Sequence, residues 1–146
     1  MNEESVADIL LVEDSPADVE LTVRALKKAN LANPILVIND GVAALDYAFR
    51  RGEYADRGSS SPKVILLAIK LPKVDGIEVL RRLKSDDATK LIPVVMLTSS
   101  REERDVVESY RLGANSYIVK PVDFEKFVEA VEHIGLYWLL LNEPPV

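Results

Sequence analysis

Short runs of apolar residues alternate with segments of helical periodicity, and this alternation repeats five times along the chain. The apolar runs span residues 6–12, 34–38, 63–69, 92–97 and 116–119. Runs that are apolar throughout are typical of strands buried on both faces of a parallel sheet. We therefore expect a sheet of five parallel strands.

A segment with apolar residues at helical spacing follows each predicted strand. The expected helices cover residues 16–29, 42–49, 77–83, 104–112 and 124–141. Ser15 is a candidate N-cap for the first of them, with Pro16 at its first helical position. Residues 51–62 are polar and predict a loop. Right-handed crossovers between parallel strands then give an α/β, doubly wound (βα)5 fold.

Composition narrows the function classes. The 146 residues suggest one domain spanning 1–146, with residues 142–146 as a C-terminal tail and no output domain. A net charge of −6 argues against nucleic acid as a partner. The absence of cysteine excludes disulfides and thiolate chemistry and fits a cytoplasmic location. No apolar stretch reaches the ~18 residues needed to span a membrane.

Chemistry-bearing residues gather where the predicted strands end. Ligands bind at the carboxyl ends of the strands in such folds, so these ends belong together. They carry Glu13 and Asp14, then Ala68, Thr98 and Lys120. Two carboxylates, a hydroxyl and an ammonium indicate a site for a divalent cation and an oxyanion. A carboxylate in the middle could form an aspartyl-phosphate, but an alanine stands there.

Four segments, ILLVEDSPAD, ILLAIKLPKVDG, PVVMLTSS and GANSYIVKP, resemble in order and spacing the receiver domain of two-component response regulators. The resemblance covers nearly the whole chain. It implies a flavodoxin-like, five-stranded parallel sheet with strand order 2-1-3-4-5. It also implies that Glu13 and Asp14 bind Mg²⁺, together with the backbone carbonyl of Lys70.

The resemblance assigns roles to three further residues. Thr98 would be the hydroxyl that turns towards the phosphoryl group, and Lys120 the ammonium that contacts it. The bond between Lys120 and Pro121 would be cis. Tyr117 would be the aromatic side chain that moves inward when Thr98 is engaged.

The phosphoacceptor aspartate of the family falls at position 68, where this chain has alanine. An aspartyl-phosphate cannot form on Ala68, and the loss of one carboxylate should weaken Mg²⁺ binding. Asp75 is no substitute, because its use would break the spacing to Leu71 and Pro72. A deliberate Asp→Ala substitution and a natural pseudo-receiver both account for this sequence.

The VEDSPAD opening and the IGLYWLLLNEPP ending resemble single-domain regulators paired with bacterial phytochromes. This resemblance implies a sensor histidine kinase as the partner. The final predicted helix adds apolar residues beyond one stripe, at Tyr137 and at residues 139–141. We expect that this second apolar face is buried in a homodimer. The alternative is a tail that folds back over its own domain.

Several functions compete at this point. The first is a signalling module without enzymatic activity, a response regulator in a non-phosphorylatable form. A Mg²⁺-dependent phosphotransferase would need a nucleophilic aspartate in place of Ala68. A flavin or nucleotide carrier would need a Ser-, Thr- or Gly-rich phosphate loop, whereas the first loop is the acidic EDSPAD. The last alternative is a pseudo-receiver that acts as a scaffold independently of phosphorylation.

Overall fold

All five predicted strands are present and parallel in the computed structural model, which describes residues 8–28, 34–58, 61–99 and 108–133. The sheet has the order β2-β1-β3-β4-β5, so the expected topology is confirmed. The strands are β1 (Ile9–Val12), β2 (Ile35–Ile38), β3 (Val64–Ala68), β4 (Val94–Thr98) and β5 (Ser116–Val119). β5 has the expected limits, and the other four strands begin or end within three residues of theirs, as is usual for strand ends.

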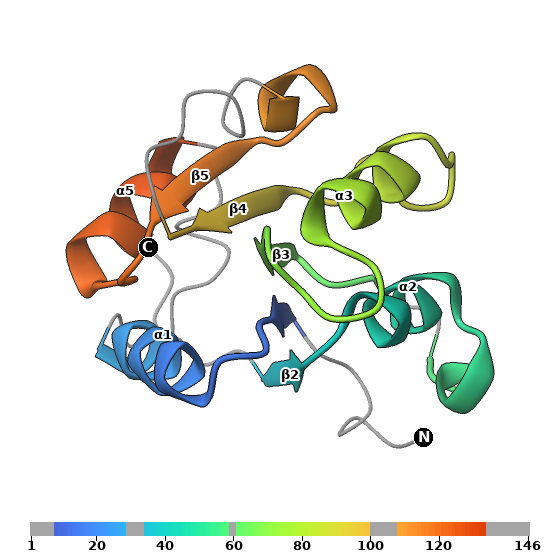
Figure 1. Ribbon diagram of the computed structural model, residues 1–146, viewed down its shortest axis with the longest axis horizontal. Coiled ribbons are helices and arrows are strands. Elements are labelled where there is room, and N and C mark those ends of the chain that lie inside the picture. The colour runs from blue at the N-terminus through green and yellow to red at the C-terminus, as the bar shows by residue number, and fades with distance from the viewer. Residues whose placement is uncertain (1–7, 29–33, 59–60, 100–107, 134–146) are drawn as a thin grey trace, which may run out of the picture.

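Helices cover both faces of the sheet (Figure 1). They are α1 (Pro16–Lys28), α2 (Gly41–Phe49), α3 (Gly76–Lys84) and α5 (Phe124–His133). Of the helix expected at 104–112, residues 108–111 are helical and 104–107 lie outside the described residues. The expected continuation of the last helix, residues 134–141, also lies outside them. Within the described ranges, no helix has the length and apolar character required to cross a membrane.

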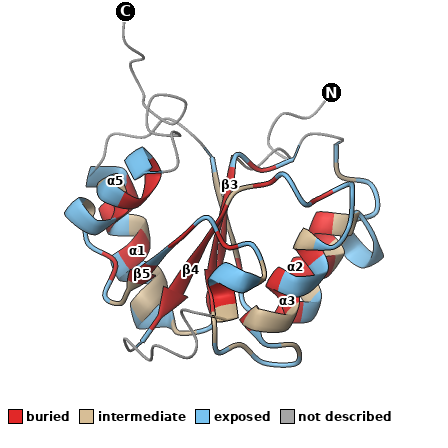
Figure 2. Ribbon diagram, turned by 90° about the horizontal axis from the view of Figure 1, so that it is seen from above, coloured by how far each residue is buried: buried red, intermediate tan, exposed pale blue. Residues whose placement is uncertain are grey.

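The inner strands β1, β3 and β4 are apolar, except for Thr98 at the end of β4, because each is buried on both faces of the sheet. Figure 2 shows the buried sheet between α1 and α5 on one side and α2 and α3 on the other. Alternate side chains enter different cores: Leu10 and Ile65 pack on the α2 and α3 side, whereas Ile9 and Leu66 pack on the α1 and α5 side. A strand with this environment cannot show the polar alternation of a half-exposed strand.

Capping residues determine where α1 and α2 begin, just after the carboxyl ends of β1 and β2. Ser15 accepts a hydrogen bond on its Oγ from the Asp18 N–H (3.3 Å), which confirms the predicted N-cap. Asp40 is the N-cap of α2, and Gly41 is the first residue of the helix. The predicted loop 51–62 also contains a short 3₁₀ helix, η2 (Gly52–Tyr54).

Candidate functional site

Strand register brings the sequence-predicted residues to one edge of the sheet. Val12 of β1 pairs with Leu67 of β3, so Glu13 follows β1 beside Ala68. Ala68 pairs with Leu97 of β4, and Thr98 comes next on that strand. The backbone N–H of Lys120 donates to the Thr98 carbonyl (2.7 Å). Lys120, which follows β5, therefore lies at the same edge as Thr98.

Glu13 and Lys120 form a buried ion pair in the middle of this edge. Lys120 Nζ lies 2.6 Å from Glu13 Oε1, and only 1% of the Glu13 side chain is exposed. The other carboxylate oxygen, Oε2, accepts hydrogen bonds from the N–H groups of Asp14 (3.1 Å) and Ser15 (3.2 Å). Asn39 holds the same turn by donating to the Glu13 carbonyl (3.0 Å). Glu13 is therefore held by hydrogen bonds at Oε2 and at its backbone, whereas the buried Oε1 accepts no hydrogen bond from the described residues and has only the ion pair with Lys120.

A second carboxylate contacts the same ammonium. Asp18, in the first turn of α1, lies with its Oδ2 3.2 Å from Lys120 Nζ. Burial acts to lower the pKa of Lys120, but the carboxylates of Glu13 and Asp18 more than reverse this, and the pKa is raised above its usual value. The ammonium is thus charged and doubly paired. The peptide bond from Lys120 to Pro121 is cis, as the resemblance implied.

The carboxylates at this edge fall short of a site that would hold Mg²⁺ tightly. Asp14 is exposed, whereas the carboxylate of Glu13 is paired with Lys120. In the parts of the chain that the structure describes, no three Asp, Glu or His side chains are grouped so that they could hold a metal ion. Ala68 offers no side-chain oxygen, and Mg²⁺ prefers a nearly complete octahedron of oxygen ligands.

The loop after β3 shows why no nearby residue replaces the missing carboxylate. Ala68 is completely buried. Asp75 is the N-cap of α3, where its Oδ1 accepts a hydrogen bond from the Glu78 N–H (2.9 Å). The Gly76 N–H donates to the Ile69 carbonyl (2.6 Å), which closes the loop tightly. Asp75 therefore serves α3, in agreement with its rejection as an acceptor from sequence spacing.

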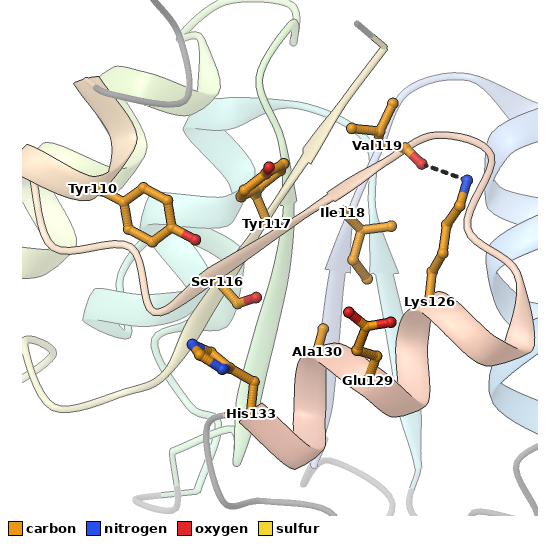
Figure 3. Close-up of a pocket in the computed structure, with 9 residues that line it drawn as sticks. All are labelled: Tyr110, Ser116, Tyr117, Ile118, Val119, Lys126, Glu129, Ala130 and His133. Atoms are coloured by element: carbon orange, nitrogen blue, oxygen red, sulfur yellow. Dashed lines mark hydrogen bonds between the residues drawn. The ribbon is translucent and has the colours of Figure 1, made fainter. Parts of the chain in front are cut away.

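Thr98 and Tyr117 occupy different environments. Thr98 is 3% exposed at the end of β4, where its backbone carbonyl accepts the hydrogen bond from the Lys120 N–H. Tyr117 is 37% exposed and packs edge-to-face on Tyr110, with ring centroids 5.9 Å apart. Figure 3 shows both tyrosines beside a hollow of about 500 Å³ between β5 and α5, with His133 at its lower end. The edge thus contains Thr98, and Tyr117 lies on a separate outer face.

Comparison with known proteins agrees with this geometry. The profile of the response regulator receiver domain matches residues 9–132. The chain belongs to the response regulator receiver family. The structure of the bacteriophytochrome response regulator AtBRR is 54% identical, with a TM-score of 0.85 over 94% of this chain and 99% of that one. The response regulator Rcp1 of Synechocystis is 41% identical over 90% of this chain and 88% of Rcp1.

A third relative has been solved in a phosphorylated state. The structure of the phosphorylated cyanobacterial phytochrome response regulator RcpA is 41% identical, with a TM-score of 0.76, and the match covers 91% of this chain and 94% of RcpA. This receiver domain is therefore related to phytochrome response regulators over nearly the whole described fold.

Two contacts in this receiver domain had no signal in the sequence patterns. Asp18 reaches the ammonium of Lys120, which is 102 residues away along the chain. Lys126 donates from its Nζ to the carbonyls of Val119 (3.1 Å) and Pro121 (3.2 Å), on either side of Lys120 (Figure 3 draws the first of these bonds). Both residues read as ordinary charged positions of amphipathic helices, and only the fold brings them to the edge.

Proposed function

We propose that this chain is a single-domain response regulator that cannot accept a phosphoryl group because Ala68 stands at the acceptor position. One observation carries the proposal. Ala68 is buried at the end of β3, between the end of β1 with Glu13 and the end of β4 with Thr98. A methyl group there has no oxygen that could attack phosphorus, while the residues on both sides are those of a phosphorylation site.

The proposed partner is a sensor histidine kinase of the phytochrome class. The relatives AtBRR and RcpA are named as phytochrome response regulators. The similarity to them extends over more than nine-tenths of this chain, which supports a common docking surface. We further propose that the protein acts in the cytoplasm by binding, without turnover of its own.

Magnesium binding is proposed to be weak. Asp14, Glu13 and the backbone carbonyl of Lys70 would supply the ligands, and a metal ion there would neutralise the charge of an incoming phosphoryl group. The missing carboxylate at position 68 and the ion pair of Glu13 with Lys120 (2.6 Å) both lower the expected affinity.

A homodimer that includes the segment after α5 is also proposed. Residues 134–146 lie outside the described part of the structure, and the support is their sequence, IGLYWLLLNEPPV. This stretch contains a tryptophan, a tyrosine and four leucines. Aromatic and aliphatic side chains of this kind are enriched in the cores of subunit interfaces.

A phosphorylation-independent scaffold is the second candidate. It is favoured by the ion pairs at the edge, because the charge of Lys120 is already neutralised by Glu13 and Asp18 without any phosphoryl group. Such a domain would present the same partner surface whether or not a phosphodonor is present.

The test restores the acceptor. The Ala68→Asp variant and the parent chain are incubated with acetyl phosphate and Mg²⁺, and the intact proteins are weighed by mass spectrometry. We expect a base-labile phosphoprotein from Ala68→Asp, formed when a carboxylate oxygen of the new side chain attacks phosphorus and acetate leaves. The parent should gain no phosphoryl group.

Ala68→Asn is the matched control, since it has the shape of aspartate but not its nucleophilic carboxylate. It should remain unmodified. If the parent or the Ala68→Asn variant is phosphorylated, the acceptor lies elsewhere and the assignment of position 68 is wrong. A second arm replaces acetyl phosphate with a phosphorylated phytochrome histidine kinase. There an excess of the parent chain should slow phosphoryl transfer to Ala68→Asp by occupying the kinase.

A further inference from the structure

The side chains of Lys120 and Glu13 meet although the strands that precede them are not neighbours in the sheet. Glu13 follows β1 and Lys120 follows β5, and the sheet order places β3 and β4 between them. Three strand spacings amount to about 14 Å, close to the combined reach of an extended lysine and glutamate. Nevertheless Nζ lies 2.6 Å from Glu13 Oε1. The two side chains must therefore extend towards each other and meet over the ends of β4 and β3.

The first turn of α1 positions Asp18 beside Lys120. The side chain of Ser15 caps the N–H of Asp18 (3.3 Å), which fixes the helical turn directly after the Glu13-Asp14 pair. Asp18 then projects its Oδ2 to 3.2 Å from Lys120 Nζ. The Lys120 side chain is 16% exposed and that of Asp18 30%, so the contact lies at the mouth of the site rather than in free solvent.

Two carboxylates, those of Glu13 and Asp18, contact the one ammonium of Lys120. The three side chains together therefore carry a net charge of −1. A phosphoryl dianion at position 68 would need the same ammonium, because lysine serves phosphoryl groups as a point charge. Glu13 is buried and held by backbone N–H groups at its other oxygen. Asp18 is therefore the partner that an incoming anion can displace.

We propose that Asp18 is a positioning residue that holds Lys120 across the edge of the sheet and competes with an anion at position 68 for its ammonium. The second half of this statement rests on the proposed function, namely that position 68 is the acceptor position. The first half concerns the parent chain and can be tested without any phosphorylation.

The first experiment observes the ammonium of Lys120 in the parent chain by ¹H–¹⁵N correlation of lysine side chains. A group held by two carboxylates exchanges its protons slowly and gives a resolved signal, which Lys120→Arg would assign by its loss. We expect Asp18→Ala to shift or abolish this signal and Asp18→Glu to retain it. Glu20→Gln, on the same helix at the exposed Glu20–Arg24 pair, should leave it unchanged.

An unchanged Lys120 signal in Asp18→Ala, or no signal from the parent, would overturn the positioning role. The signal of Lys126 serves as an internal reference, since its partners are the carbonyls of Val119 and Pro121. Thermal unfolding of each variant confirms that the fold is intact before the spectra are compared.

The second experiment adds the same substitutions to the Ala68→Asp variant and measures phosphorylation rate against acetyl phosphate concentration. Loss of a negative charge that competes for Lys120 should raise the second-order rate constant about threefold in Asp18→Ala, chiefly through a lower half-saturating concentration. Glu20→Gln, added to Ala68→Asp, should have the same rate constant as Ala68→Asp alone. An equal or slower rate in Asp18→Ala contradicts the competition. If Ala68→Asp itself is not phosphorylated, the proposed function fails, while the NMR result still decides the role of Asp18.

Discussion

Gly76 shows how closely the backbone is packed around position 68. A Cβ added to Gly76 would lie 1.9 Å from the Ala68 carbonyl oxygen and 2.9 Å from the Ile69 Cα. These are backbone atoms at the end of a completely buried strand, so they cannot move aside cheaply. The glycine is required here for close approach of two backbone segments.

Gly76→Ala should therefore lower the free energy of unfolding by about 2 kcal/mol, within the usual cost of overpacking. The sign is informative, because alanine in a helix without a clash is favoured over glycine by roughly 1 kcal/mol. Urea denaturation of the parent and the variant measures the difference. Lys27→Ala, at an exposed position of α1, is the control and should change stability by no more than about 0.5 kcal/mol. A stabilised Gly76→Ala would show that the loop after β3 is looser than described.

At the scale of single residues, the sequence predicted the edge but not its internal pairing. Glu13, Thr98 and Lys120 were placed correctly because each stands at a strand end, and strand ends share one edge of a parallel sheet. The contact of Lys120 with Asp18 depends on how far a long side chain reaches across the sheet, which no spacing along the chain encodes. Asp75 could be rejected as an acceptor from its spacing, whereas its role as a cap needed the helix start.

At the scale of elements, the C-terminal end of α2 depends on a side chain from the following loop. The guanidinium of Arg57 donates to the carbonyls of Tyr47 (2.5 Å) and Ala48 (3.2 Å), which lie in the last turn of the helix. It also stacks on the Tyr47 ring, 4.4 Å from the centroid. Burial lowers the pKa of Arg57, and Tyr47 partly offsets this effect. The guanidinium stays protonated at neutral pH, because arginine remains charged in proteins.

Arg57→Ala should lower the free energy of unfolding by about 2 kcal/mol, since it removes charge-assisted hydrogen bonds and a cation–π contact. Arg57→Lys should lose about half as much, because lysine keeps the charge but not the planar fork that reaches two carbonyls. Chemical denaturation gives both values. Arg24→Ala removes an exposed pair with Glu20 and should cost at most about 0.5 kcal/mol. If Arg57→Ala matches Arg24→Ala, the loop does not support α2.

The elements themselves were largely predictable, and their exceptions have a physical cause. Buried strands and amphipathic helices carry strong periodic signals, so all strands were found within a few residues. The 3₁₀ helix at residues 52–54 was missed because a single turn has no period and its sequence, GEY, is polar. The hydrogen bonds of Arg57 were also not predicted. They join a loop to the end of α2, and the composition of a segment does not indicate such contacts.

At the scale of the whole molecule, two-sided burial of the strands determined the three-layer architecture. A sheet whose side chains enter two cores must be covered by helices on both faces, and the alternation of strands and helices supplies them. The strand order came from the family resemblance instead, because right-handed crossovers alone allow more than one order. The assembly of two such molecules follows from neither argument and requires measurement.

The proposed homodimer makes a prediction for the full chain in solution. Sedimentation velocity at micromolar concentration should give the mass of a dimer of the 146-residue chain. Replacing Leu139 and Leu140 together by glutamate should give a monomer that still unfolds cooperatively, because charges in an apolar interface core are strongly unfavourable. Leu91→Glu is the control, since Leu91 is 86% exposed in the loop between α3 and β4 and should leave the dimer intact. A monomeric parent would exclude the dimer at this concentration, and a monomeric Leu91→Glu would move the interface to that loop. If the double variant unfolds at a clearly lower temperature while the parent is a monomer, these leucines cover their own domain instead.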